Sequence, residues 1–155
     1  MQERKSFVPV DPDYEARVRA SFARQGAMAH IGAVLTRVEP GLVAIELPYR
    51  PELSQQHGFF HAGITSTVAD SAGGYAGFTL FGASDSVLTV EFKMNLLAPA
   101  DGNKLVATGR VIKAGRTLTI CELEVVVLKG GRESHCAHGM QTLICLKDRP
   151  DHSVA

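Results

Sequence analysis

Asp70 is the only formally charged residue between positions 62 and 83, a stretch otherwise rich in glycine, alanine, serine and threonine. A carboxylate in such neutral surroundings is costly to bury unless it is hydrogen-bonded or has a function. Carboxylates act as nucleophiles towards acyl groups and as general bases towards water. Two interpretations follow: a reactive carboxylate, or a structural aspartate bonded to a serine or threonine on a neighbouring turn.

Two histidines precede this stretch, within the segment QQHGFFHAG at positions 55–63. A helix is expected to begin here, and its first N–H groups, those of Ala62 to Ile64, lack partners within the helix. Free amides at the positive end of a helix dipole suit an anion or a developing oxyanion. Alternatively, His61 does no more than cap the helix. A zinc site at His57 and His61 would lack a third ligand nearby, so no metal is expected.

The spacing between the histidine and the aspartate predicts more than one chain. His61 and Asp70 are nine positions apart, which on a helix is roughly 13 Å along the axis and about half a turn around it. The two side chains of one chain cannot easily reach one small reacting group. If both act on one substrate, an antiparallel pairing of two such helices is needed. We therefore expect a homo-oligomer, either a symmetric dimer or a dimer of dimers, with composite sites.

The elements that position these residues follow from the hydrophobic pattern. A helix is expected at residues 13–25, because Tyr14, Val18 and Phe22 recur at helical spacing, with Gly26 as its stop. A long central helix is expected from Ala62 onward. Alternating or β-branched runs predict strands at 31–39, 42–47, 87–97, 105–114, 117–129 and 133–146.

This order of elements predicts the α+β class. The central helix carries small and apolar residues nearly all round, so a six-stranded antiparallel sheet is expected to wrap around it and bury it on several sides. The small residues would allow close contact between helix and sheet. The edges of such a sheet stay open, and long apolar edges favour pairing with a second copy of the chain.

Composition excludes several classes of function. The 155 residues include 16 Lys/Arg and 16 Asp/Glu, and aromatics make up only 6%, so no nucleic-acid partner is expected. A membrane span at 62–83 is not expected either, because an aspartate at its centre would be expensive in lipid. Three unpaired cysteines and the lack of a signal peptide predict reduced thiols and a cytoplasmic location.

The segment HGFFHAGITSTVAD at 57–70 resembles the signature of hotdog-fold acyl-CoA thioesterases of the PaaI (phenylacetic acid degradation) type. The likeness continues through VLTVEF at 87–92, APA at 98–100 and the KAGRT hairpin at 113–117. It implies the hotdog fold, an acyl-CoA substrate, and no cofactor, since coenzyme A is part of the substrate.

The domain organisation is expected to be simple. An N-terminal arm and helix should occupy residues 1–27, the hotdog thioesterase domain residues 28–147, and a polar tail residues 148–155. This length is enough for one domain with a substantial core.

The resemblance implies catalytic roles at five positions. Asp70 would be the nucleophile or the general base, and the backbone N–H of Ala62 would hold the thioester carbonyl oxygen. His61 would position the loop and the thioester, with the Gln55 side chain near the reacting carbonyl. Thr89 would orient water near the carboxylate in the opposite subunit. Two positions depart from the family: alanine stands at 62 where glycine is usual, and Gln55 replaces a frequent asparagine.

Four further residues are expected to contact the substrate. Gly63 belongs to the helix start. Phe60 either lines the acyl pocket or packs beneath the loop. Lys113 and Arg116, near strand ends and turns, either hold coenzyme A phosphates or are solvated surface charges.

Other chemistries have weaker support. Ser54 and Ser66 lack a G-x-S-x-G setting, and of the histidines beside Cys136 only His138 shares its face of a strand. Two alternatives remain open: a dehydratase or hydratase of acyl thioesters on the same architecture, and a non-catalytic acyl-CoA-binding protein. The acyl group and the choice between nucleophile and general base also stay open.

Overall fold

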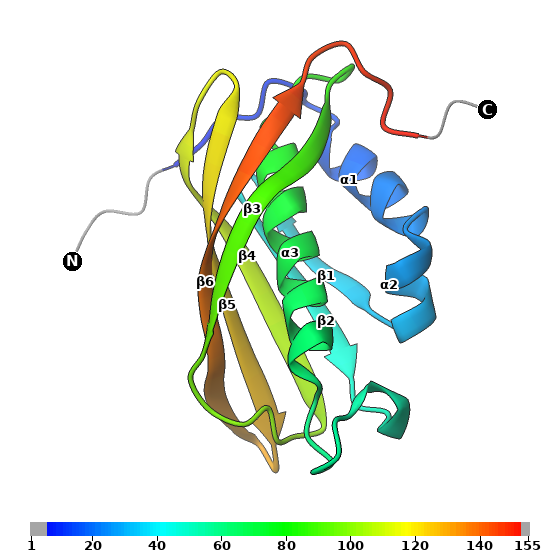
Figure 1. The fold of residues 1–155 in the computed structure, drawn as a ribbon. Coiled ribbons are helices and arrows are strands. Elements are labelled where there is room, and N and C mark those ends of the chain that lie inside the picture. Colours follow the sequence, from blue (N-terminus) through cyan, green and yellow to red (C-terminus); the bar gives the residue numbers. More distant parts are fainter. Residues whose placement is uncertain (1–5, 153–155) are drawn as a thin grey trace.

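The computed structural model describes residues 6–152, so positions 1–5 of the expected arm and 153–155 of the expected tail lie outside the described residues. Residues 6–152 fold into three α-helices, one short 3-10 turn and six strands (Figure 1). In chain order these are α1 (Tyr14–Ala23), α2 (Gly26–Ile31), β1 (Val34–Glu39), β2 (Leu42–Pro48), η1 (Pro51–Leu53), α3 (Ala62–Phe78), β3 (Ser86–Leu96), β4 (Lys104–Ala114), β5 (Leu118–Lys129) and β6 (Arg132–Leu146).

The six strands form one antiparallel sheet in the order β1-β2-β4-β5-β6-β3. The strand order places β1 and β3 at the two edges. Helix α3 lies across the concave face of the sheet, as Figure 1 shows. The expected α+β class, the sheet and the long helix are confirmed. Five of the six expected strands begin and end within one residue of the prediction, and buried and less buried residues alternate along much of β4, β5 and β6.

Small residues let α3 approach the sheet closely, as expected. A Cβ on Gly73 would collide with the side chains of Gln141 and Leu123, and one on Gly77 would collide with Leu143. On the strand side, a Cβ on Gly109 would meet the backbone of α3. Each glycine in a helix costs about 1 kcal/mol relative to alanine. The close contact with the sheet offsets that cost by burying the apolar surface of the helix.

The sheet buries α3 on several sides, as expected, but leaves one side of the helix uncovered. The sheet leaves one stripe of α3 uncovered, and its members are exposed or half-buried at helical spacing: Gly63, Thr67, Asp70, Ser71 and Gly74. We call this stripe the open face of α3. Asp70 is therefore half-buried, so its carboxylate is accessible from outside the core.

The N-terminal region also differs from the prediction. Gly26 does not end a helix but begins the short helix α2, which ends at Gly32 with a φ of 81°. The left-handed conformation at Gly32 is one that glycine adopts without strain. The sequence pattern misled because α2 is only six residues long and its apolar Ile31 was assigned to the following strand. Helix α2 also crosses the expected domain boundary at residue 27.

Arg17 in α1 holds the C-terminal end of α3. Its Nη2 donates to the backbone carbonyls of Phe78 at 3.3 Å and Phe81 at 2.7 Å, and its Nε pairs with Asp11 at 2.8 Å. A cation at this end of a helix interacts favourably with the exposed carbonyls, typically by about 0.3–2 kcal/mol. This contact places α1 beside α3, where α1 contributes to the site described below.

The edge strand β3 is unusually apolar on its exposed surface. Leu88, Val90 and Phe92 expose 58%, 56% and 45% of their surface, and Leu96 exposes 60%. A long apolar edge strand with unpaired backbone groups is a typical surface for pairing with another strand.

In the described part of the chain, no helix is both long and apolar enough to cross a bilayer.

Candidate active site

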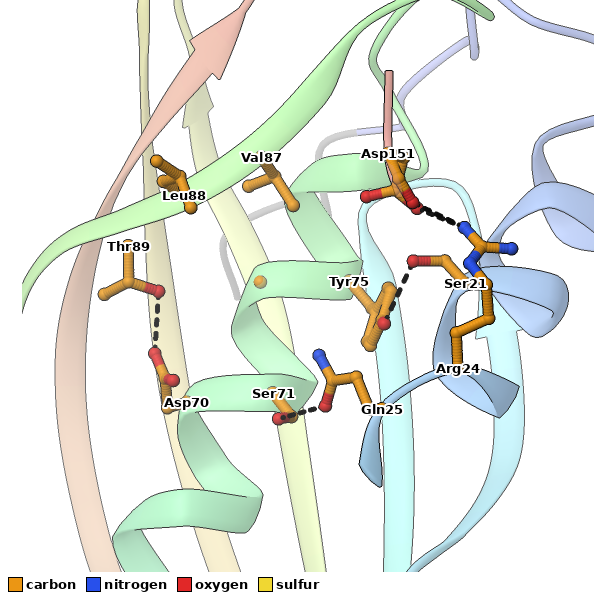
Figure 2. Close-up of a pocket in the computed structure, with 11 residues that line it drawn as sticks. Ser21, Arg24, Gln25, Asp70, Ser71, Tyr75, Val87, Leu88, Thr89 and Asp151 are labelled. Carbon is orange, nitrogen blue, oxygen red and sulfur yellow. Dashed lines mark hydrogen bonds and ion pairs between the residues drawn. The ribbon is translucent and has the colours of Figure 1, made fainter. Parts of the chain in front are cut away.

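The carboxylate of Asp70 is held by two side chains of its own chain. The hydroxyl of Thr89, on β3, donates to Oδ1 of Asp70 at 2.7 Å (Figure 2). The amide Nε2 of Gln141, on β6, donates to the same oxygen at 2.6 Å. Thr89 therefore lies beside the carboxylate of its own chain, whereas the resemblance implied a place near the carboxylate of the opposite subunit.

Gln141 was not among the expected site residues. It is only 1% exposed and stands between Gly139 and Leu143 on the face of β6 that packs against α3. The available signal was the alternation of β6: a polar amide occupies an inward position that otherwise takes small or apolar residues. The sequence alone gave no reason to connect it to a carboxylate 71 positions away.

A hollow of about 510 Å³ opens beside Asp70. Figure 2 shows Asp70 and Thr89 on one side and Ser21, Arg24 and Gln25 of the N-terminal region on the other. Val87 and Leu88 of β3 supply apolar surface between them. This hollow, which we call the Asp70 hollow, is thus walled by the open face of α3, the edge strand and the chain's two ends.

Polar pairs line the far wall of the Asp70 hollow. The hydroxyls of Ser21 and Tyr75 lie 3.1 Å apart, and Ser71 donates to Gln25 at 3.2 Å. Arg24 closes this wall through an ion pair with Asp151 at 2.9 Å. Burial raises the pKa of Tyr75 above its usual value, so its hydroxyl stays protonated at neutral pH and remains a donor.

The start of α3 presents a free backbone donor. His61 is the N-cap, and its Nδ1 accepts a hydrogen bond from the N–H of Gly63 at 2.9 Å. His61 thus caps the helix, and the N–H of Gly63 is not a free donor because it binds His61. Among the described residues, no acceptor binds the N–H of Ala62.

A second hollow, of about 520 Å³, adjoins this donor. We call it the Ala62 hollow. Gln55 lines it, with Oε1 accepting from the N–H of His57, as does Phe60, which is 3% exposed and packs edge-on against Tyr49. Most of the remaining wall is apolar and comes from Phe59, Leu96, Leu97, Ala98, Pro99 and Ala100.

The structure does not bring the two expected cations to either hollow. Lys113 is exposed near the end of β4, at an irregularity in its pairing with β5. Arg116 lies in the β4–β5 turn, where it lines a separate hollow of about 340 Å³ with Lys147 and Arg149. Whether either residue meets a substrate therefore depends on surfaces outside these two hollows.

None of the cysteines is a candidate nucleophile. All three are free and buried, as expected for reduced core thiols. Burial raises the pKa of Cys121 to about 12 and that of Cys136 to about 11. Thiols with such values are protonated at neutral pH and unreactive. Of the groups that line the two hollows, the Asp70 carboxylate can act as a base or nucleophile and the Ala62 amide as a hydrogen-bond donor.

Comparison with known proteins shows similarity to thioesterases. Residues 57–134 match the family model described as the thioesterase superfamily. The crystal structure of a thioesterase family protein from Silicibacter pomeroyi is 47% identical, covers 86% of this chain and 98% of its own, and superposes with a TM-score of 0.85.

Two further proteins widen the comparison. The proofreading thioesterase EntH of Klebsiella pneumoniae is 28% identical over 75% of this chain and 85% of its own length. The PaaI protein of Escherichia coli, from the phenylacetic acid degradation operon, is 15% identical, with a TM-score of 0.79 over 89% of this chain and 96% of its own. The likeness to PaaI concerns the fold, and it confirms the expected hotdog architecture.

Proposed function

Because the chain belongs to the thioesterase superfamily, whose reaction is thioester hydrolysis, we propose that it hydrolyses an acyl-CoA to the free acid and coenzyme A. We further propose that each active site is shared: one subunit supplies the Asp70 carboxylate and the other supplies the N–H of Ala62. Coenzyme A is part of the substrate, and no cofactor is needed for this reaction.

One observation carries the proposal of a shared site. Asp70 and Ala62 lie on the same helix, eight positions apart, which is about 12 Å along its axis. Each opens into its own hollow, and the two hollows have similar volumes. A single chain therefore holds the attacking group and the oxyanion donor too far apart for one carbonyl group. Antiparallel packing of two open faces of α3 would unite one hollow of each kind.

The surface around the open face supports this packing. Leu88 and Thr89 of the edge strand line the Asp70 hollow, while Leu96 at the other end of β3 lines the Ala62 hollow. A second copy that pairs antiparallel along β3 would cover the exposed Val90 and Phe92 and bring opposite ends of the strand together.

The chemistry needs one carboxylate and one donor. In the nucleophilic route, Asp70 attacks the thioester carbonyl carbon, the C–S bond breaks, and the thiolate of coenzyme A leaves and takes a proton from solvent. Water then hydrolyses the mixed anhydride, which releases the acid and restores the carboxylate. In the general-base route, Asp70 takes a proton from the attacking water and passes it to the departing thiolate. Both routes consume one water molecule.

The Ala62 amide would stabilise the tetrahedral oxyanion in either route. A preorganised backbone donor of this kind contributes about 3–4 kcal/mol to the transition state. Alanine at this position keeps the N–H at the first turn of the helix, so the departure from the usual glycine does not remove the donor. His61 supports the donor by capping the same turn.

Three earlier expectations remain predictions. Lys113 and Arg116 are expected to contact coenzyme A phosphates only if the second subunit brings them near a site. A cytoplasmic location is expected from the reduced cysteines.

A mixing experiment tests the shared site. Asp70→Asn removes the carboxylate, and Ala62→Pro removes the amide proton at N1, where helices tolerate proline. His61, with φ −65° and ψ 136°, has the conformation that a residue before proline prefers. Each variant alone should release little thiol from acyl-CoA, whereas isolated mixed dimers, which keep one intact site of two, should show about half the wild-type rate.

Differently tagged copies of the two variants allow the mixed dimers to be purified after co-expression, with each variant's own homodimer as control. Mixed dimers as inactive as the homodimers would show that the two groups do not act across the interface. Full activity in Asp70→Asn would show that Asp70 is not the catalytic carboxylate.

A further inference from the structure

We propose that Gln141 is a positioning residue for the reaction: with Thr89 it fixes Oδ1 of Asp70, so that Oδ2 is the oxygen that reacts. This role rests on the proposed function of Asp70 and adds a residue that neither the sequence pattern nor the family likeness pointed to.

The hydrogen bonds at Asp70 are unevenly distributed between its two oxygens. Oδ1 accepts from Thr89 at 2.7 Å and from Nε2 of Gln141 at 2.6 Å. The same Nε2 lies 3.1 Å from the hydroxyl oxygen of Thr89 and 3.1 Å from the backbone carbonyl of Asp70. Among the described residues, none donates a hydrogen bond to Oδ2. One oxygen is thus anchored from two strands, and the other is left available beside the hollow.

The orientation of the Gln141 amide follows from its neighbours. A flipped amide would place Oε1 against the carboxylate oxygen and lose the donor. In the observed orientation, Oε1 is buried without a hydrogen-bond partner and lies against Gly73 of α3. A Cβ on Gly73 would collide with this oxygen, so the helix has a glycine where the amide sits.

If residue 141 only filled space in the core, an apolar side chain would stabilise the fold more than this amide does. A buried acceptor that lacks a partner is unfavourable, and an apolar side chain of similar volume would fill the space without that penalty. The next inward position on β6 shows such a residue: Leu143 is 0% exposed and packs over Gly77, one helical turn beyond Gly73. Gln141 and Leu143 thus meet the helix in the same way, but only Gln141 reaches the carboxylate.

The expected benefit is a carboxylate held in one orientation before substrate binds. Both the nucleophilic and the general-base route use one carboxylate oxygen at a defined angle, and a small displacement of a reacting group lowers the rate strongly. Gln141 lies beneath Asp70 and is too buried to touch the substrate, so its loss should change turnover rather than substrate affinity.

Gln141→Met tests the role, because methionine keeps the volume and removes the donor. The quantities to measure are thiol release from hexanoyl-CoA and benzoyl-CoA and the thermal unfolding midpoint. The expected result is a fall in kcat of up to about 100-fold, little change in KM, and an unfolding midpoint that is unchanged or higher. Leu143→Met, a volume-conserving change at the matched position, should leave kcat unchanged.

The outcomes separate the two levels of the proposal. Unchanged kcat in Gln141→Met, while Asp70→Asn is inactive, would overturn the role of Gln141 and leave the proposed function standing. A fall in kcat that matches a lower unfolding midpoint, or one that also occurs in Leu143→Met, would mean a structural role and overturn it too. No thiol release from either probe by the wild-type protein would overturn both.

Discussion

The two reactive groups on α3 have opposite surroundings: Asp70 lies in the middle of the helix among hydrogen-bond donors, and the Ala62 amide lies at its start in a largely apolar hollow. Around Asp70, side chains from two strands bind one carboxylate oxygen, and the far wall of the hollow is polar. Around Ala62, no described residue accepts a hydrogen bond from the backbone N–H, and the hollow is largely apolar. An anion needs donors to hold it in place, whereas an oxyanion donor acts more strongly when no competing acceptor or water surrounds it. The contrast is that expected of two complementary halves of a site.

The largest expected effects come from removing each half in turn. Asp70→Asn should lower kcat by about 10²–10⁴-fold, because the attacking or proton-accepting group is lost. Ala62→Pro should lower it by about 10²–10³-fold, because one oxyanion donor is lost. Steady-state thiol release from acyl-CoA measures both.

Ala62→Gly is the control for the second variant. It retains the N–H and restores the residue usual in the family, so kcat should stay close to wild type. A loss in Ala62→Gly as large as that in Ala62→Pro would mean that the methyl group, rather than the amide, matters at this end of the helix.

A smaller effect should separate the packing of α3 from its chemistry. Gly73→Ala and Gly77→Ala both force a Cβ into the sheet, which should destabilise each variant by about 1–3 kcal/mol in urea unfolding. Only the added methyl at Gly73 displaces the amide of Gln141. We therefore expect kcat to fall in Gly73→Ala and to persist in the folded fraction of Gly77→Ala; equal losses would contradict a special role for the Gly73 contact.

The smallest effect on turnover is expected from the loop that joins α3 to β3 and so connects Asp70 to Thr89. Burial would raise the pKa of Asp85 in this loop, but hydrogen bonds from Lys147 and from the backbone of Asp148 and Gly82 outweigh it and hold the pKa below its usual value. A lowered pKa in the folded state means that the stabilisation is present above the unfolded pKa of about 3.9 and is lost as the pH falls through the folded value.

Asp85→Asn should therefore be less stable than wild type at pH 7, by about 1–3 kcal/mol for lost hydrogen bonds to a charged group, and the gap should shrink below about pH 4. Urea unfolding at several pH values measures this difference. A gap that stays constant with pH would indicate a loss of packing instead of a loss of charge. Turnover at neutral pH should not change.

The fold was largely predictable because its signals are local. Alternating or β-branched runs predicted the strands, and the small residues from Ala62 onward predicted a helix packed closely on a sheet. The low charge of the segment indicated a helix buried on several sides, but it did not show that the side carrying Gly63, Thr67 and Asp70 would stay open. Helix α2 was missed because six residues are too few to show a period.

The site was predictable only where its parts are close in sequence. Asp70 stood out by its isolation, and the free amides follow from any helix start. Gln141 could not be linked to Asp70, because the contact joins β6 to α3 and depends on the register of the sheet. For the same reason, the sequence could not show that the turn of Arg116 lies at a hollow separate from those of Asp70 and Ala62.

Part of the far wall of the Asp70 hollow comes from the chain's two ends. Ser21 lies in α1, Arg24 and Gln25 follow that helix, and Asp151 comes after the last strand. Substitutions in these peripheral segments can therefore reshape the Asp70 hollow while the helix that carries Asp70 and Ala62 stays intact. Under the proposed function, the shape of this hollow would then vary independently of the hydrolytic groups.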